Sequence, residues 1–262
     1  MQAQLITRLE SLHAHYGRED SFKLGPRTII AERILIGVNT NTMASARLLA
    51  IASELGMPDD CLAVLLPQAG DANVVFFGFE QQADCCICKV YLELWDQLRR
   101  TTRRTGSQAP QLLHLGVKWD SARPDRHAVA RYDCHPLLDT RAILRRMAAC
   151  YGDPASPVLC ALAQAIVLQA AQNQPGASML YLEVNEAGNA RASFDINLYK
   201  SGMLVADASA QLHQAGDYFG LDAAVIDAQL ARLGACPLGH LSSGLDRHGQ
   251  PFLTVYGETV AI

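Results

Sequence analysis

The chain has 262 residues, of which 50% are hydrophobic and 18% charged, so it is large and apolar enough to bury a sizeable core. Its net charge of −4 argues against a nucleic-acid partner, which would need a basic surface. No apolar run reaches the roughly 18 residues of a membrane-spanning helix. The polar N-terminal segment is unlike a signal peptide, so we expect one cytoplasmic domain spanning residues 1–262.

Hydrophobic periodicity divides the chain into helices and strands. Gly, Pro and Asn clusters mark the turns between them. The pattern first predicts a helix at 2–16, a strand at 31–39 and a helix at 43–56. Four strands follow, at 73–81, 86–95, 111–120 and 127–135, and then two helices, at 140–152 and 156–172. The rest of the chain is predicted as strands at 178–186 and 190–199, helices at 205–220 and 223–234, and strands at 239–247 and 251–258.

The order of these elements repeats: one or two helices are followed by a hairpin of two strands. Such a unit cannot bury its own sheet face, so neighbouring units must stack or close on one another. About nine or ten antiparallel strands built in this way would close into a barrel with the helices outside.

Polar and apolar side chains alternate along the predicted strands. In residues 86–95, Lys89, Tyr91 and Glu93 share one face, and the residues between them are Val and Leu. If helices cover the apolar faces, the polar faces line a wide lumen in which a ligand could bind. The alternative is a half-buried sheet whose polar face meets water.

Three segments resemble the ABBA-type aromatic prenyltransferases, and most closely the peptide prenyltransferases of cyanobactin-type pathways. They are IIAERILIGVNTNTMASARLLAIASELGM at 29–57, NVVFFGFEQQADCCICKVYLELW at 73–95 and HLSSGLDRHGQPFLTVYGE at 240–258. The resemblance implies an α+β fold, an antiparallel β-barrel of repeated ααββ units with the helices on the outside, called the PT barrel or ABBA fold. It also implies transfer of a dimethylallyl or similar isoprenyl group from its diphosphate to a peptide side chain, in the biosynthesis of a ribosomal peptide natural product (RiPP).

In such enzymes Lys, Arg and Tyr side chains at alternating strand positions hold the diphosphate. Lys89 and Tyr91 match this pattern best. Fixed cations and hydroxyl donors stabilise the negative charge that builds up as the diphosphate departs. Strand parity assigns the same role to Lys118, Arg131, Tyr199, Thr254 and Tyr256.

Four acidic residues share the polar parity and are candidate catalytic groups: Glu93, Asp133, Glu183 and Asp195. Carboxylates would repel a diphosphate, so we place them on the acceptor side of the lumen. A neutral phenol or indole needs at most one base. Two or more carboxylates would suit an arginine guanidinium, which is therefore our candidate acceptor.

No metal-ligand set is predicted. The eight cysteines lack the paired CxxC spacing of zinc sites, and we interpret His114, His240 and His248 as structural or rim residues. The metal motif DDxxD of the helical prenyl synthases is absent, although Mg²⁺ could bind through the diphosphate. Two alternatives stay open: an ABBA enzyme acting on a small aromatic, and a non-catalytic barrel that binds a small ligand or peptide.

Overall fold

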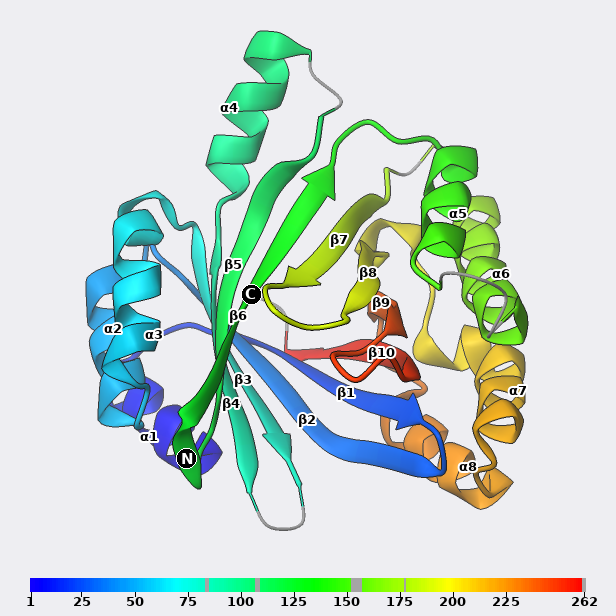
Figure 1. Ribbon diagram of the computed structural model, residues 1–262, viewed down its shortest axis with the longest axis horizontal. Helices are drawn as coiled ribbons and strands as arrows, with labels where there is room; N and C mark the ends of the chain where they lie inside the picture. Colours follow the sequence, from blue (N-terminus) through cyan, green and yellow to red (C-terminus); the bar gives the residue numbers. More distant parts are fainter. Residues whose placement is uncertain (83–84, 107–108, 152–156, 177, 261–262) are drawn as a thin grey trace.

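The computed structural model describes residues 1–82, 85–106, 109–151, 157–176 and 178–260. Its ten strands form one closed barrel in which each strand pairs antiparallel with both neighbours (Figure 1). The strands are β1 (Gly17–Gly25), β2 (Thr28–Asn39), β3 (Val74–Gln81), β4 (Cys86–Glu93), β5 (Gln111–Asp120), β6 (Arg123–His135), β7 (Leu180–Glu186), β8 (Ala192–Asn197), β9 (Leu238–Leu245) and β10 (Pro251–Val260). The helix-wrapped antiparallel barrel predicted from the sequence is confirmed.

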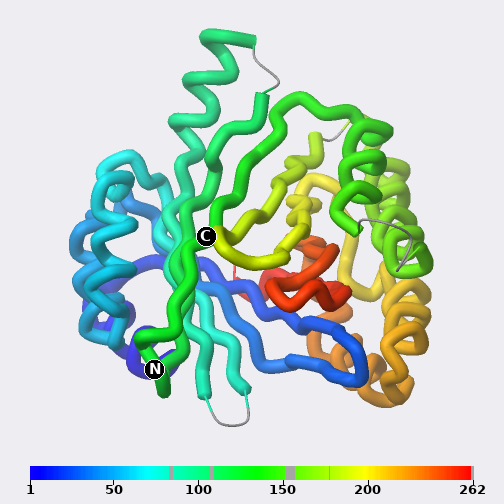
Figure 2. Tube along the Cα trace, viewed as in Figure 1, coloured from blue at the N-terminus to red at the C-terminus, as the bar shows by residue number. Residues whose placement is uncertain are grey.

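Helices cover the outside of the barrel in two groups on opposite sides, as the trace in Figure 2 also shows. The first group packs against β2–β5, and the second against β7–β10 and β1. The first consists of α1 (Gln2–Ser11), α2 (Ser45–Glu54), α3 (Asp59–Leu65) and the 3-10 helix η1 (Leu66–Asp71); the second consists of α5 (Thr140–Ala149), α6 (Pro157–Asn173), η2 (Tyr199–Ser201), η3 (Val205–Ala208), α7 (Ser209–Phe219) and α8 (Ala223–Leu233).

The strands have one apolar and one polar face, and this determines which side of the barrel is dry. On β8, Phe194 and Ile196 are fully buried against the helices. Asp195 and Asn197, which alternate with them, line a cavity inside the barrel. The same holds on β4, where Val90 joins the outer core and its neighbours face inward. The polar lumen inferred from alternation is therefore present.

Strand order separates the two ends of the barrel. The chain runs up one strand and down the next, so the five hairpin turns all lie at one end. We call this the hairpin end. The helical connections lie at the opposite end, which we call the helix end. The helix α4 (Trp95–Thr105) projects from the body there (Figure 1).

Several elements differ from the sequence prediction: α3 and η1 were not predicted, and Tyr199 lies in η2 and not in a strand. Strand β1 was missed because Arg18, Glu19 and Asp20 follow one another and conceal its alternation. Helix α4 was missed because its only buried side chain is Leu98, so it has no apolar stripe. Strand β6 begins at Arg123, where a turn was predicted. None of the helices within the described ranges is long and apolar enough to cross a membrane.

Replacing Ile166 by Ala should lower the free energy of unfolding by about 2–5 kcal/mol, because it leaves a cavity between α6 and the sheet. Ile166 is fully buried in the hydrophobic core between the second group of helices and the barrel. Urea unfolding measures the change. The matched control is Val158→Ala on the same helix, where the side chain is 51% exposed and the change should stay within about 0.5 kcal/mol. Equal losses in the two variants would contradict this account of the core.

Candidate active site

A cavity of about 730 Å³ opens at the hairpin end of the lumen, within the usual size range of small-ligand sites. Basic side chains outnumber acidic ones in its lining, where the acids are Glu80, Asp120 and Asp246. The basic residues are Lys23, Arg33, Lys89, Lys118, Arg123, Arg126, Arg191 and Arg247. This end of the lumen is suited to an anion with several charges.

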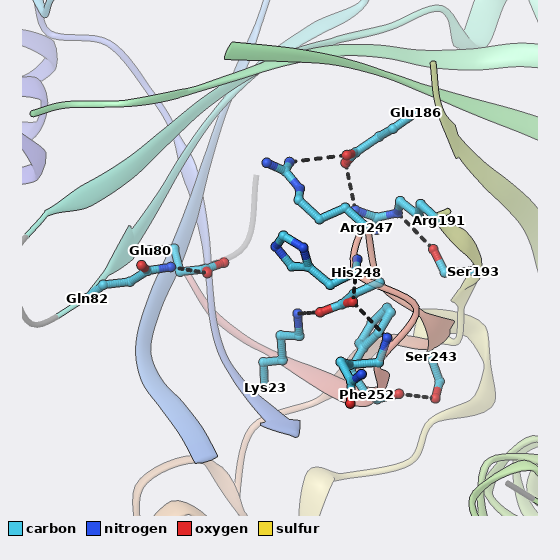
Figure 3. Close-up of polar contacts among 12 residues, drawn as sticks. Lys23, Glu80, Gln82, Glu186, Arg191, Ser193, Ser243, Arg247, His248 and Phe252 are labelled. Carbon is cyan, nitrogen blue, oxygen red and sulfur yellow. Dashed lines mark hydrogen bonds and ion pairs between the residues drawn. The ribbon is translucent and has the colours of Figure 1, made fainter. Parts of the chain in front are cut away.

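Two buried carboxylates hold these cations in place. Glu80 accepts hydrogen bonds from Arg33 Nε at 3.1 Å and Lys89 Nζ at 2.8 Å. These pairs lower the pKa of Glu80 well below its usual value, although burial acts in the opposite direction. The second carboxylate, Glu186, binds three cations, two of which are seen in Figure 3. Buried charges are costly unless paired, so these two acids lower the cost of burying the cations around the hairpin-end cavity, which we call the basin.

The helix end of the lumen holds a different set of groups. Glu19, Glu93, Asp195 and His240 line its cavity beside aromatic and aliphatic side chains. Asp195 Oδ1 lies 2.6 Å from His240 Nδ1. Burial lowers the pKa of His240, but the carboxylates of Asp195 and Glu19 together raise it to about 9. His240 is therefore charged at neutral pH and offsets one of the carboxylates.

Glu19 is the carboxylate that is best placed to accept a proton. The Tyr199 hydroxyl donates a hydrogen bond to its Oε1. Its Oε2 is buried and has no hydrogen-bond partner within the described part of the chain. Burial raises the pKa of Glu19 above its usual value. A buried, half-satisfied carboxylate of raised pKa has the properties of a general base.

Three tyrosines lie between the two ends, since Tyr91, Tyr132 and Tyr256 line both cavities. The rings of Tyr91 and Tyr132 meet edge to face with centroids 5.6 Å apart. Burial raises the pKa of all three phenols, which keeps them neutral. Neutral aromatic faces of this kind attract a cation within about 6 Å. Gly116 lies opposite Tyr91 and gives the ring its space.

Most of the residues predicted for diphosphate binding lie together in the lumen. Lys89, Tyr91 and Tyr256 line both cavities, and Lys118 and Thr254 line the hairpin-end cavity. Tyr199 lies on η2, where it supports Glu19 and packs its ring against His240 at 5.6 Å. Of the predicted acids, Glu93 and Asp195 face the helix-end cavity.

The predicted inward orientation of Arg131, Asp133 and Glu183 is wrong. Tyr132 lines the lumen, so its neighbours Arg131 and Asp133 point the other way, and they pair with each other at 3.5 Å. Glu183 binds Arg146 of the outer helix α5 at 2.9 Å. On β7 it is the apolar Leu182 that lines the lumen, while Tyr181 is buried in the outer core.

Several lumen residues were not predicted from the sequence. Lys23 and Glu19 lie on β1, which was missed as a strand, and His240 was interpreted as structural. Arg191 has the parity of Asp195 in the predicted strand 190–199, so parity could have identified it, whereas Arg247 has the opposite parity to His240 in the predicted strand 239–247 and lies in a turn. Parity could have identified Arg33, because it is two residues from Leu35 on a strand that was predicted.

Across the described ranges, no three His, Cys, Asp or Glu side chains are grouped so that they could hold a metal ion. Glu80 and Glu186 are already engaged by cations. Binding of Mg²⁺ through the oxygens of the diphosphate stays a prediction.

Lys23 should make diphosphate binding dependent on pH. Burial lowers the pKa of Lys23 to about 8, so its ammonium is charged below pH 8 and neutral above it. In Lys23→Arg the charge persists, and the wild type should bind inorganic diphosphate about three- to tenfold more weakly than this variant at pH 9 but not at pH 6.5. Calorimetric titration measures both, and the ratio of the two dissociation constants cancels the ligand's own ionisation. A ratio that is the same at both pH values would contradict the prediction.

The architecture is similar to that of several solved structures. 5-Dimethylallyltryptophan synthase from Streptomyces coelicolor superposes with a TM-score of 0.60 and 17% identity over 92% of this chain and 80% of that chain. PriB in complex with product diphosphate gives a TM-score of 0.58 and 14% identity over 93% and 79%. 6-Dimethylallyltryptophan synthase from Micromonospora olivasterospora, in complex with DMASPP and Trp, gives 0.56 and 14% over 92% and 81%.

Sequence comparison adds no closer relative: no protein-family model matches the chain, and no curated protein matches it. At 14–17% identity, the structural likeness establishes the fold. The closer likeness to cyanobactin-type peptide enzymes stays a prediction. The chain thus has the ABBA prenyltransferase barrel, with a cationic hairpin end, a tyrosine-lined middle and a helix end that carries a buried carboxylate.

Proposed function

We propose that the protein transfers a dimethylallyl group from dimethylallyl diphosphate to an aromatic acceptor, an indole or phenol ring. The observation that carries this proposal is the order of groups along the lumen: cations, then neutral aromatic rings, then a buried carboxylate. The structural neighbours include a prenyltransferase in complex with product diphosphate and one in complex with DMASPP and Trp.

Each group in that order has a task in the reaction. The C–O bond of the donor breaks, and its electron pair leaves with the diphosphate, whose charge Lys89, Lys118 and Arg191 stabilise. The allylic cation is left facing Tyr91 and the other tyrosine rings. A ring carbon of the acceptor attacks the cation, and the proton that the acceptor then loses passes to the carboxylate of its general base.

We assign the role of general base to Glu19. Asp195 is ion-paired with His240, and Glu93, whose side chain is 24% exposed, lies 3.5 Å from His114 Nε2 without a hydrogen bond. Glu19 is the lumen acid with a buried, unpartnered oxygen among the described residues. A neutral ring needs one base, which Glu19 supplies. A guanidinium would also meet the positive charge of His240 next to these carboxylates, which favours an aromatic acceptor over arginine.

A peptide acceptor is the second candidate, and helix α4 favours it. Trp95 at the start of α4 lines the helix-end cavity, and the helix then projects outward (Figure 1). Four arginines follow within this one helix: Arg99, Arg100, Arg103 and Arg104. They could attract an acidic stretch of a peptide whose modified side chain lies in the lumen.

The direct test incubates the protein with dimethylallyl diphosphate and tryptophan, tyrosine, blocked arginine or a tryptophan-containing peptide. Mass spectrometry should detect the addition of one dimethylallyl unit to the indole or phenol compounds. Modification of arginine alone would establish the guanidinium acceptor instead. No modification of any acceptor, with the donor still bound, would favour the non-catalytic alternative.

Replacing Glu19 by Gln should lower kcat by about 10²- to 10⁴-fold with little change in KM, because it removes the proton acceptor and keeps the shape. Steady-state kinetics with the modified acceptor measure both constants. Asp133→Asn is the matched control, because it removes a carboxylate that does not line the lumen, and it should retain the wild-type kcat. A Glu19→Gln variant with the wild-type kcat would rule out this base.

Replacing Gly116 by Ala should lower kcat by about tenfold or more, since a Cβ there would lie 2.2 Å from Cδ1 of Tyr91 and displace the ring. Gly70→Ala is the control, because nothing lies within 4 Å of its added Cβ. Turnover and thermal unfolding are measured together. The position of the Tyr91 ring would be unimportant for catalysis if Gly116→Ala folded and turned over normally.

A further inference from the structure

We propose that Glu186 is a positioning residue of the donor site. It holds Lys118, Arg191 and Arg247 together before the diphosphate arrives, and it opposes the diphosphate once bound. This inference rests on the proposed function, because it takes the hairpin end as the diphosphate site. Glu186 itself lies at the end of β7 with a side chain that is 0% exposed.

Four donors converge on this one carboxylate. Its Oε1 accepts hydrogen bonds from Lys118 Nζ and, at 2.8 Å, from Arg191 Nη1. Its Oε2 accepts from Arg247 Nη2 and Asn189 Nδ2, both at 3.1 Å. Figure 3 shows the guanidinium groups of Arg191 and Arg247 turned toward it from neighbouring segments. Each oxygen therefore serves two donors, and the carboxylate is fully engaged by the protein.

The three cations come from separate parts of the barrel. Lys118 lies on β5, Arg191 on the turn between β7 and β8, and Arg247 on the turn between β9 and β10. Their like charges repel one another in a buried basin. The common carboxylate converts that repulsion into three attractive pairs. Glu186 thus ties two hairpin turns to a strand and preorganises the cations for a diphosphate.

The same carboxylate has a cost for the bound ligand. Lys118 and Arg191 outweigh burial and lower the pKa of Glu186 to about 2, so Glu186 stays negative throughout the neutral range. A diphosphate that contacts the same cations must lie near this charge and is repelled by it. Glu186 therefore favours an assembled site but weakens the binding of its anionic occupant, which includes the product.

The charge of Lys118 depends on Glu186. Burial is the largest effect on the pKa of Lys118 and lowers it, the cations of Arg191 and Lys89 lower it further, and Glu186 raises it. Without Glu186, Lys118 would lose its proton at a lower pH. Four charged groups face Lys118: Lys89 on β4, Glu186 on β7, and Arg191 and Arg247 on the turns. On β6, the residue paired with Lys118 in the strand register is the uncharged Ala128.

These two effects give Glu186→Gln a distinctive pH dependence. With the repulsion gone, the variant should bind inorganic diphosphate about threefold or more tightly than the wild type at pH 6. Because Glu186 raises the pKa of Lys118, its loss makes Lys118 lose its proton at a lower pH, so this advantage should shrink by about threefold or more between pH 6 and pH 9. Calorimetric titration at both pH values measures the ratio of the two dissociation constants, which should change with pH. A ratio that is constant with pH would mean a merely structural role.

Lys118→Arg supplies the control, because a guanidinium does not titrate in this range. In the double variant with Glu186→Gln, tight binding should persist at pH 9. In the Lys118→Arg background, the ratio of dissociation constants with and without Glu186→Gln should therefore be the same at both pH values, and a ratio that still changes with pH would contradict the proposal. If Glu186→Gln does not fold, Glu186→Asp replaces it: the charge stays but the shorter side chain loses contacts to the cations, so diphosphate should bind about threefold or more weakly, and wild-type binding would contradict the proposal.

Failure of this inference is distinguishable from failure of the proposed function. If the folded wild type binds no inorganic diphosphate at any pH, the hairpin end is not the donor site. If the wild type binds diphosphate and the ratio does not change with pH, the donor site stands and the role given to Glu186 is wrong.

Discussion

The structure depends on the pairing of charges inside a closed barrel. Ten strands with one apolar and one polar face can bury the apolar face only under helices, which turns the polar face inward. Lysines and arginines enclosed in this way would be strongly destabilising if left alone. Glu80 and Glu186 pair with five of them at one end and leave an excess of positive charge. At the other end carboxylates are the buried charges in excess, and the cation of His240 offsets the carboxylate of Asp195.

Strand topology then separates these charges along the barrel axis. The five hairpins turn at the hairpin end, and two of these turns contribute Arg191 and Arg247 to the basin. Glu19 lies at the opposite end, where the strands connect to helices. The tyrosines lie halfway, on three strands that are distant in sequence but brought together by closure. The antiparallel strand order therefore places the anion site and the base at opposite ends of the lumen, and the proposed reaction proceeds from the first to the second.

The fold could be predicted because the alternation and the helix–hairpin repeat are local signals in the sequence that recur in most strands of the closed barrel. For the same reason parity placed Lys89, Lys118 and Asp195 correctly in the lumen. It failed on β7, where the large ring of Tyr181 packs under the helices and Leu182 faces the lumen, because polarity alone does not say which face has room for an aromatic ring. Parity did not predict Arg247, because this residue of the predicted strand 239–247 lies in a turn and its position depends on a distant carboxylate.

The number of free carboxylates bears most directly on the acceptor. Four acids were expected to face the lumen, a number that suits a cation, yet Asp133 and Glu183 point away from it. Asp195 is committed to His240, so the helix end is less negative than its acids suggest. Glu19 keeps one oxygen unpartnered in the described structure, and burial raises its pKa, which makes its carboxylate a stronger proton acceptor. A guanidinium would lose its hydration on entering, and it would meet the positive charge of His240 beside Glu19 and Glu93. A neutral ring avoids that cost, because it loses little hydration on entering and gives up its proton only after the new bond has made it acidic.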